Sequence, residues 1–151
     1  MQIEKYLNVS PFYVIEKSYR AMQKQMANKL IKENINHHQA LLLIAISLEK
    51  NNIVHPKSLS LSFKLSKANI SQQLSILEEK KFLKRKISLE DARSIQVSLT
   101  ESGRKKASKL ITLFDGLQKG WEYKFGENKL NQLLTDISQL ESDVEENHAS
   151  S

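Results

Sequence analysis

The sequence predicts a mainly α-helical protein with one small β-hairpin. Three observations support this fold class. The chain has only 4 glycines and 2 prolines in 151 residues, so few positions favour tight turns. Long stretches carry apolar residues at helical spacing, whereas two short runs within residues 82–99 are strand-like. A chain of this length can bury a core without disulfides, and it has no cysteine.

The first predicted helix begins at Ser10 and Pro11, because serine caps helices and proline fits the first helical position. Its apolar residues recur at spacings of three and four, and they are Phe12, Ile15, Tyr19, Met22, Met26 and Leu30. Such a stripe is far more often packing surface than a cofactor site. It therefore predicts core or subunit interface.

A second helix is expected to start at Asn36, with Gln39 reaching back to it as in a capping box. Residues 40–46 are apolar nearly all round, so this helix should be buried on most sides. A short third helix is expected from Pro56 to about Phe63.

Ser66 is expected to cap a fourth helix that ends near Lys80. Its residues Ile70, Leu74 and Leu77 recur at i, i+4 and i+7 and form one buried stripe. The opposite face carries small or amide side chains, which allow a close approach to the major groove of DNA. The third and fourth helices together predict a helix-turn-helix.

Residues 83–99 predict a β-hairpin with a charged tip, in which Ile95, Val97 and Leu99 alternate at period two. A hairpin directly after a helix-turn-helix makes a winged helix. Thr100 is expected to cap the next helix, which Gly116 and Gly120 weaken.

A last helix is expected from about Glu127, followed by a frayed tail at residues 145–151. The residues that it is expected to bury are Leu130, Leu133, Leu134, Ile137, Leu140 and Val144.

The positive charge of the chain is concentrated around the helix-turn-helix and the hairpin. Residues 57–109 hold 13 Lys or Arg against 5 Asp or Glu, a net +8, whereas residues 110–151 hold 3 against 8, a net −5. A basic segment of this kind is typical of proteins that bind polyanions, although a solvated charged surface gives the same pattern.

The order of motifs resembles the MarR family of bacterial winged-helix transcription regulators. The runs that carry the resemblance are LEEKKFL at residues 77–83, DAR at residues 91–93 and VSLTESG at residues 97–103. It covers roughly residues 10–145. In one departure, Lys81 stands where the family usually has glycine, so the left-handed cap of the recognition helix should be strained or absent.

The resemblance implies a single domain over residues 1–151. Residues 10–34 and 104–146 would form dimerisation helices, and residues 36–100 would form the winged helix-turn-helix lobe, with the wing at residues 83–99.

The resemblance also implies which residues contact DNA. On the fourth helix these are Ser66, Lys67, Asn69, Ser71, Gln72, Gln73 and Ser75. Asn69 and Gln72 are the best candidates for base edges, because amides can pair with adenine in a bidentate manner. Gln73 lies nearer the buried stripe and is a weaker candidate.

In the wing, Arg85 and Lys86 are expected to contact phosphates, and Arg93 resembles the minor-groove arginine of the family. Asp91 is expected to orient the Arg93 guanidinium. The alternative for both sets is a solvated surface with ion pairs of little consequence.

The family resemblance further implies a homodimer, a palindromic operator, action as a repressor and release by a small aromatic or phenolic effector. Candidate effector-binding residues are Tyr13, Tyr19, His38 and Trp121, although ordinary packing is the more frequent role of such residues.

No cofactor or metal is expected, because His37, His38, His55 and His148 lack ligand spacing. No catalytic grouping indicates an enzyme. A winged helix that contacts only proteins remains the alternative. Without a long apolar run, we expect a cytoplasmic protein that contacts no membrane.

Overall fold

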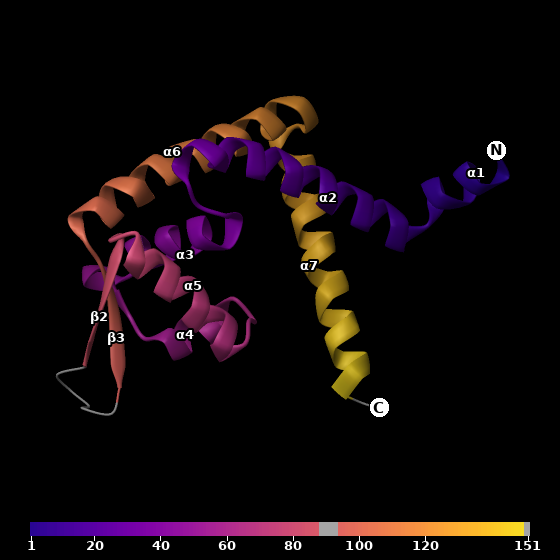
Figure 1. The fold of residues 1–151 in the computed structure, drawn as a ribbon. Helices are drawn as coiled ribbons and strands as arrows, with labels where there is room; N and C mark the ends of the chain where they lie inside the picture. The colour runs from indigo at the N-terminus through magenta and orange to yellow at the C-terminus, as the bar shows by residue number, and fades with distance from the viewer. Residues whose placement is uncertain (88–93, 150–151) are drawn as a thin grey trace. The chain divides into compact units, whose positions relative to one another are not determined.

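The computed structural model describes the backbone of residues 1–87 and 94–149, and the side chains of residues 1–87 and 94–144. The chain divides into two compact units, residues 1–108 and residues 109–151, which we describe separately. Figure 1 shows the elements, which are mostly helices with one small sheet. The predicted fold class is therefore confirmed.

The first unit begins with α1 (Gln2–Val9) and α2 (Pro11–Leu30). The sequence reasoning did not predict α1. Helix α2 has Pro11 in its first turn as predicted, but the side chain of Ser10 makes no capping hydrogen bond. The apolar stripe of α2 is largely uncovered within this chain, since Phe12 is 88% and Tyr19 54% exposed.

Helix α3 (His37–Leu48) is the centre of the core. Its residues Leu42, Leu43 and Ile46 are completely buried. The predicted capping box is present, because the Asn36 side chain accepts from the Gln39 amide N–H at 2.8 Å and the Asn36 N–H donates to Gln39 Oε1 at 3.1 Å.

The helix-turn-helix consists of α4 (Pro56–Ser62) and α5 (Lys67–Glu79). The predicted stripe of α5 is buried, and α5 packs against both α3 and α4. As predicted, Ser66 caps α5, because its Oγ accepts from the Asn69 N–H at 3.2 Å.

The sheet has three antiparallel strands in the order β1 (Ile53–Val54), β3 (Ile95–Leu99) and β2 (Leu83–Ile87). Leu83 pairs with Leu99 and Ile87 pairs with Ile95, which confirms the predicted hairpin. The two-residue strand β1 was not predicted. Residues 88–93, with Asp91 and Arg93, lie outside the described residues.

Lys81 ends α5 in the left-handed region, with φ of 61°. The Phe82 N–H donates to the Leu77 carbonyl at 3.0 Å, and the Lys81 N–H donates to the Glu78 carbonyl at 2.8 Å. These two bonds form a Schellman motif. Of the two outcomes expected for this position, a strained cap or no cap, the structure has the strained cap.

Lys81→Gly is therefore expected to raise the free energy of unfolding by about 0.5–1 kcal/mol. The left-handed conformation costs an L-residue about 1–2 kcal/mol, and the greater freedom of glycine in the unfolded chain offsets part of this gain. Urea denaturation measures the difference. Lys81→Ala is the matched control, because it removes the same charge but keeps the Cβ. Equal stabilisation by alanine would show that the charge, and not the backbone, causes the effect.

Thr100 and Gly103 join the end of the sheet to α6 (Glu101–Phe125). The Thr100 Oγ1 donates to the Lys81 carbonyl at 2.7 Å and accepts from the Gly103 N–H at 3.0 Å, so the predicted cap is confirmed. A Cβ built on Gly103 would lie 1.8 Å from the Phe82 carbonyl oxygen. Residues 77–83 and 99–103, which carry two of the family motifs, are therefore in contact where Gly103 approaches Phe82.

The second unit contains the rest of α6 and α7 (Glu127–Ala149), joined at Gly126. Helix α6 runs through Gly116 and Gly120 as one element. The tail was expected to fray from residue 145, but α7 continues to Ala149.

The apolar stripe of α7 is mostly not buried within this chain. Leu130 is 7% exposed, as expected, whereas the expectation of burial is wrong for five other residues that are 51–54% exposed, namely Leu133, Leu134, Ile137, Leu140 and Val144. None of the described helices is long and apolar enough to cross a membrane.

Candidate nucleic-acid interface

Helix α5 presents a polar surface opposite its buried stripe. Four of the predicted DNA contacts are exposed there, and they are Ser66, Lys67, Ser71 and Gln72. Ser75 is half-buried, and its Oγ donates to the Ser71 carbonyl at 2.9 Å. The exposed side chains are short apart from Lys67 and Gln72, so a partner surface can approach the helix closely.

Asn69 is less free than its predicted role requires. Its Oδ1 is buried and has no hydrogen-bond partner among the described residues. A bidentate contact with adenine needs both the oxygen and the nitrogen of the amide. Asn69 must therefore rotate before it can make such a contact, whereas Gln72 is already exposed.

Gln73 is half-buried and turned toward the start of α3. Its Oε1 accepts from Asn36 Nδ2 at 3.3 Å and from Gln39 Nε2 at 3.1 Å. Sequence reasoning identified Asn36 and Gln39 only as capping residues. Their contact with α5 spans more than thirty residues of sequence, and no local pattern indicates it.

Arg85 of β2 holds the wing against α5. Its Nη2 donates to the Ser71 carbonyl at 2.8 Å and to Ser75 Oγ at 3.1 Å, and its backbone N–H donates to Glu78 Oε1 at 2.9 Å. Its Nη1 lies 3.8 Å from Glu78 Oε2. The guanidinium is therefore engaged with α5, and its predicted phosphate contact stays a prediction.

Arg85→Ala is expected to lower the free energy of unfolding by about 1 kcal/mol, because partly exposed acceptors on α5 lose their donor. Lys86→Ala should leave the stability nearly unchanged, because Lys86 is exposed. Urea denaturation of both variants tests this difference. An unchanged midpoint for Arg85→Ala would show that these contacts do not stabilise the fold.

The remaining basic residues of β2 lie on the other face of the strand. Because side chains alternate along a strand, Lys84 and Lys86 point away from the face that carries Leu83 and Arg85. Both lysines are exposed. Lys86 is thus accessible for its predicted contact with a phosphate, which stays a prediction.

An ion pair joins the segment before α3 to the start of α6. Lys106 Nζ lies 2.8 Å from Glu33 Oε2, and the two side chains are 20% and 8% exposed. The Lys106 ammonium also lies 5.3 Å from the centre of the Phe82 ring. Nearby, the Lys80 ammonium donates to the Asn34 carbonyl. These contacts fix the end of α5 within the first unit.

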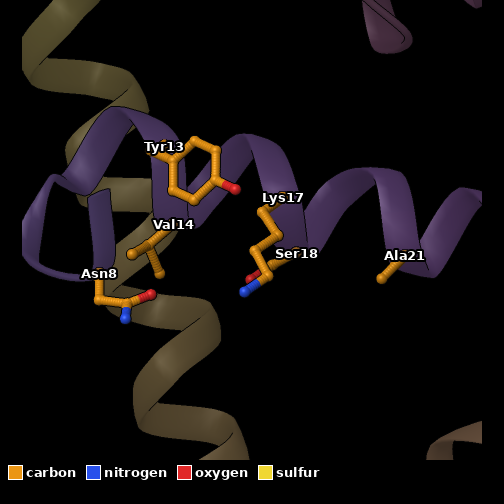
Figure 2. A pocket seen from close by; sticks show the side chains of 6 residues that line it. All are labelled: Asn8, Tyr13, Val14, Lys17, Ser18 and Ala21. Carbon is orange, nitrogen blue, oxygen red and sulfur yellow. The ribbon is translucent and has the colours of Figure 1, made fainter. Parts of the chain in front are cut away.

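The candidate effector residues do not line one common cavity among the described residues of the first unit. Tyr13 borders an open hollow of about 470 Å³ beside α2, which Figure 2 shows with Asn8, Val14 and Lys17. His38 borders a different hollow, of about 480 Å³, at the start of α3. The Tyr19 hydroxyl accepts from Gln23 Nε2 at 2.7 Å.

Trp121 is half-buried on α6 in the second unit.

Partial burial lowers the pKa of His37 below its ordinary value, and the neighbouring His38 adds to this effect. Within the described part of the chain, no group of three His, Asp or Glu side chains is arranged to hold a metal ion.

Comparison with known proteins identifies relatives of this region. Residues 40–116, about half of the chain, match the family described as "Winged helix DNA-binding domain". The HTH-type transcriptional regulator PapX of Escherichia coli is 32% identical over 69 residues, which are 46% of this chain. The match spans only 42% of the length of PapX.

Solved structures with the same fold include three regulators. The MepR–DNA complex of Staphylococcus aureus has a TM-score of 0.82 at 19% identity and covers 89% of this chain and 98% of that chain. AbsC, a MarR family regulator from Streptomyces coelicolor, has a TM-score of 0.79 at 16% identity, with 89% and 91% covered. A mutant MarR from Escherichia coli in complex with operator DNA has a TM-score of 0.74 at 16% identity, with 88% and 95% covered. These likenesses confirm the fold that the sequence resemblance implies.

Proposed function

Because this chain belongs to the winged helix DNA-binding domain family, we propose that it is a sequence-specific, DNA-binding regulator of transcription. The observation that carries the proposal is the exposed face of α5, where Ser66, Lys67, Ser71 and Gln72 leave room for the edges of base pairs. We further propose that it acts as a repressor on DNA in the cytoplasm.

The charge distribution supports the same function. The segment of residues 57–109, which contains α5 and the hairpin, carries a net charge of +8, and the neutralisation of DNA phosphates by this segment would release counterions. Lys84 and Lys86 are the exposed basic residues of β2 that would contribute to this term. Binding should therefore weaken steeply as the salt concentration rises.

Gln72→Ala is expected to weaken operator binding by about 1–3 kcal/mol and to relax the preference at one base position of each half-site. The reason is that the exposed Gln72 amide can pair with one base. Lys86→Ala is the matched comparison. Loss of a phosphate contact should weaken binding to all DNA sequences alike, and it should reduce the slope of the logarithm of the binding constant against the logarithm of the salt concentration by about 1. If Gln72→Ala weakened all sequences equally, Gln72 would not be a base reader.

We also propose that the protein acts as a homodimer with twofold symmetry. The support is the set of apolar side chains on α1, α2 and α7 that the chain leaves at least 46% exposed, among them Ile3, Tyr6, Phe12, Ile15, Tyr19, Met22, Ile137 and Leu140. A twofold dimer would place two α5 helices about one DNA turn apart, so the operator should be palindromic. Sedimentation at micromolar concentration should give twice the 17.4 kDa chain mass.

A small aromatic or phenolic effector would bind in one of the open hollows beside Tyr13 or His38. This proposal rests on the family resemblance together with these two hollows. Isothermal titration calorimetry with phenolic compounds can measure such binding. To count as an effector, a bound compound must also lower the affinity of the protein for its operator.

Selection of bound sequences from random DNA duplexes tests the central proposal. The expected result is a palindrome whose half-sites lie about one helical turn apart. If no sequence were enriched over the starting pool, the proposal of sequence-specific binding would be wrong, and a winged helix that contacts only proteins would be the better hypothesis.

A further inference from the structure

Three side-chain amides meet where the start of α3 touches α5. Asn36 and Gln39 belong to the capping box of α3, and Gln73 lies one residue beyond the exposed Gln72 on α5. The Gln73 Oε1 accepts from Asn36 Nδ2 at 3.3 Å and from Gln39 Nε2 at 3.1 Å. Gln73 is thus bound twice, and both bonds go to its oxygen.

The capping box determines which way the first two amides point. Backbone N–H groups can only donate, so the Asn36 Oδ1 must face the Gln39 N–H and the Gln39 Oε1 must face the Asn36 N–H. Each amide therefore directs its NH₂ group away from its own helix end. Both NH₂ groups converge on Gln73.

The orientation of Gln73 follows from these two donors. Because Gln73 faces two NH₂ groups, it must turn its oxygen toward them. If its own NH₂ group faced them instead, three NH₂ groups would meet without an acceptor. The Gln73 Nε2 is then left with two N–H donors that have no acceptor among the described residues. Gln73 is half-buried, so this end of the side chain is still reachable from outside.

We propose that Gln73 is a specificity-determining residue that offers DNA a donor and no acceptor, and that Asn36 and Gln39 are the positioning residues that hold it so. This inference rests on the proposed function of α5 as the groove-reading helix. A donor alone suits guanine N7 and O6 or thymine O4, whereas cytosine presents a donor of its own in the major groove. Bidentate pairing with adenine is excluded, because it requires the amide oxygen.

Gln73→Glu tests the reading group directly. The substitution keeps one oxygen for Asn36 and Gln39 and replaces the NH₂ group by a second oxygen of nearly the same size. Selection from random duplexes should then show a change at one position of each half-site, from guanine or thymine to cytosine, by about tenfold or more. The other positions of the operator should keep their preferences.

Asn36→Asp tests the positioning residue without a change on α5. Aspartate caps helices as well as asparagine does, and Asn36 is exposed, so the variant should fold. Its second carboxylate oxygen would face Gln73 and accept from the Gln73 NH₂ group. Gln73 would have to turn its amide to do so, so that its oxygen in place of its NH₂ group would face DNA, and the preference at the same operator position should change by about tenfold.

Asn34→Asp is the matched control for Asn36→Asp, because it adds the same charge two residues away on another exposed asparagine. Its side chain makes no contact with Gln73 among the described hydrogen bonds. It should weaken binding to all sequences slightly and leave the base preference unchanged.

The outcomes separate this inference from the proposed function. If the unaltered protein enriched no sequence, the proposed function itself would fail. If it enriched a palindrome and both Gln73→Glu and Asn36→Asp preserved the preference at every position, the inference about Gln73 would be overturned. Should Gln73→Glu fail to fold by circular dichroism, the comparison of Asn36→Asp with Asn34→Asp still decides.

Discussion

Gly103→Ala is expected to lower the free energy of unfolding by about 3 kcal/mol or more, the largest effect on stability that we predict. The added Cβ would lie 1.8 Å from the Phe82 carbonyl oxygen and 2.8 Å from its carbon, and neither backbone atom can move without disturbing the cap of α5. The same oxygen accepts from the Thr100 N–H at 3.0 Å, so a shift would also disturb the junction with α6.

Gly116→Ala and Gly120→Ala are the matched controls, because both glycines lie in α6 and a Cβ on either would meet nothing within 4 Å. Each should stabilise the protein by about 0.5–1 kcal/mol through the better helix propensity of alanine. Thermal unfolding of the three variants gives the comparison. A Gly103→Ala protein as stable as the unaltered one would mean that the close approach to Phe82 is not tight in solution.

The double substitution Ile137→Asp with Leu140→Asp is expected to produce monomers and to weaken operator binding by about 100-fold or more. Both residues are 51% exposed on the apolar stripe of α7, where carboxylates buried between two chains would lose their hydration. Without the dimer, each half-site must be bound separately, and the benefit of linked binding is lost.

Gln139→Asp with Ser142→Asp provides the control for this double variant. Both residues lie on α7 and are exposed, and helical spacing places them away from the apolar stripe. The charge added is the same, but the dimer should persist. Sedimentation and an operator titration distinguish the two double variants. A dimer that survived Ile137→Asp with Leu140→Asp would show that α7 lies outside the interface.

Most of the first unit could be predicted because its signals are local. The Ser66 cap, the buried stripe of α5 and the alternation along β3 each occupy a short stretch, and the structure confirms all three. Helix α1 was missed although Ile3, Tyr6 and Leu7 recur at i, i+3 and i+4, because a helix of eight residues is marginal by itself and its pattern is short. The strand β1 has two residues and depends on β3 for its hydrogen bonds.

The arrangement of the candidate site was harder to predict, because it depends on contacts between distant residues. Arg85 looks in sequence like one of three consecutive basic residues, and only its strand face directs it to Ser71 and Ser75. Likewise, the burial of Asn69 Oδ1 depends on what surrounds α5. The roles of these residues toward DNA stay predictions.

The hydrogen bonds from the α3 capping box to Gln73 affect how binding preferences can be compared between related proteins. If Gln73 contacts a base as proposed, two related proteins with identical residues at positions 66–75 would favour different operators when one has asparagine and the other aspartate at position 36. The effect of a change at Gln73 would likewise depend on what stands at that position, so the two substitutions would be epistatic. Operators that are assigned by comparing recognition helices alone would then be wrong for such pairs. The comparison must include residue 36 as well as the residues of α5.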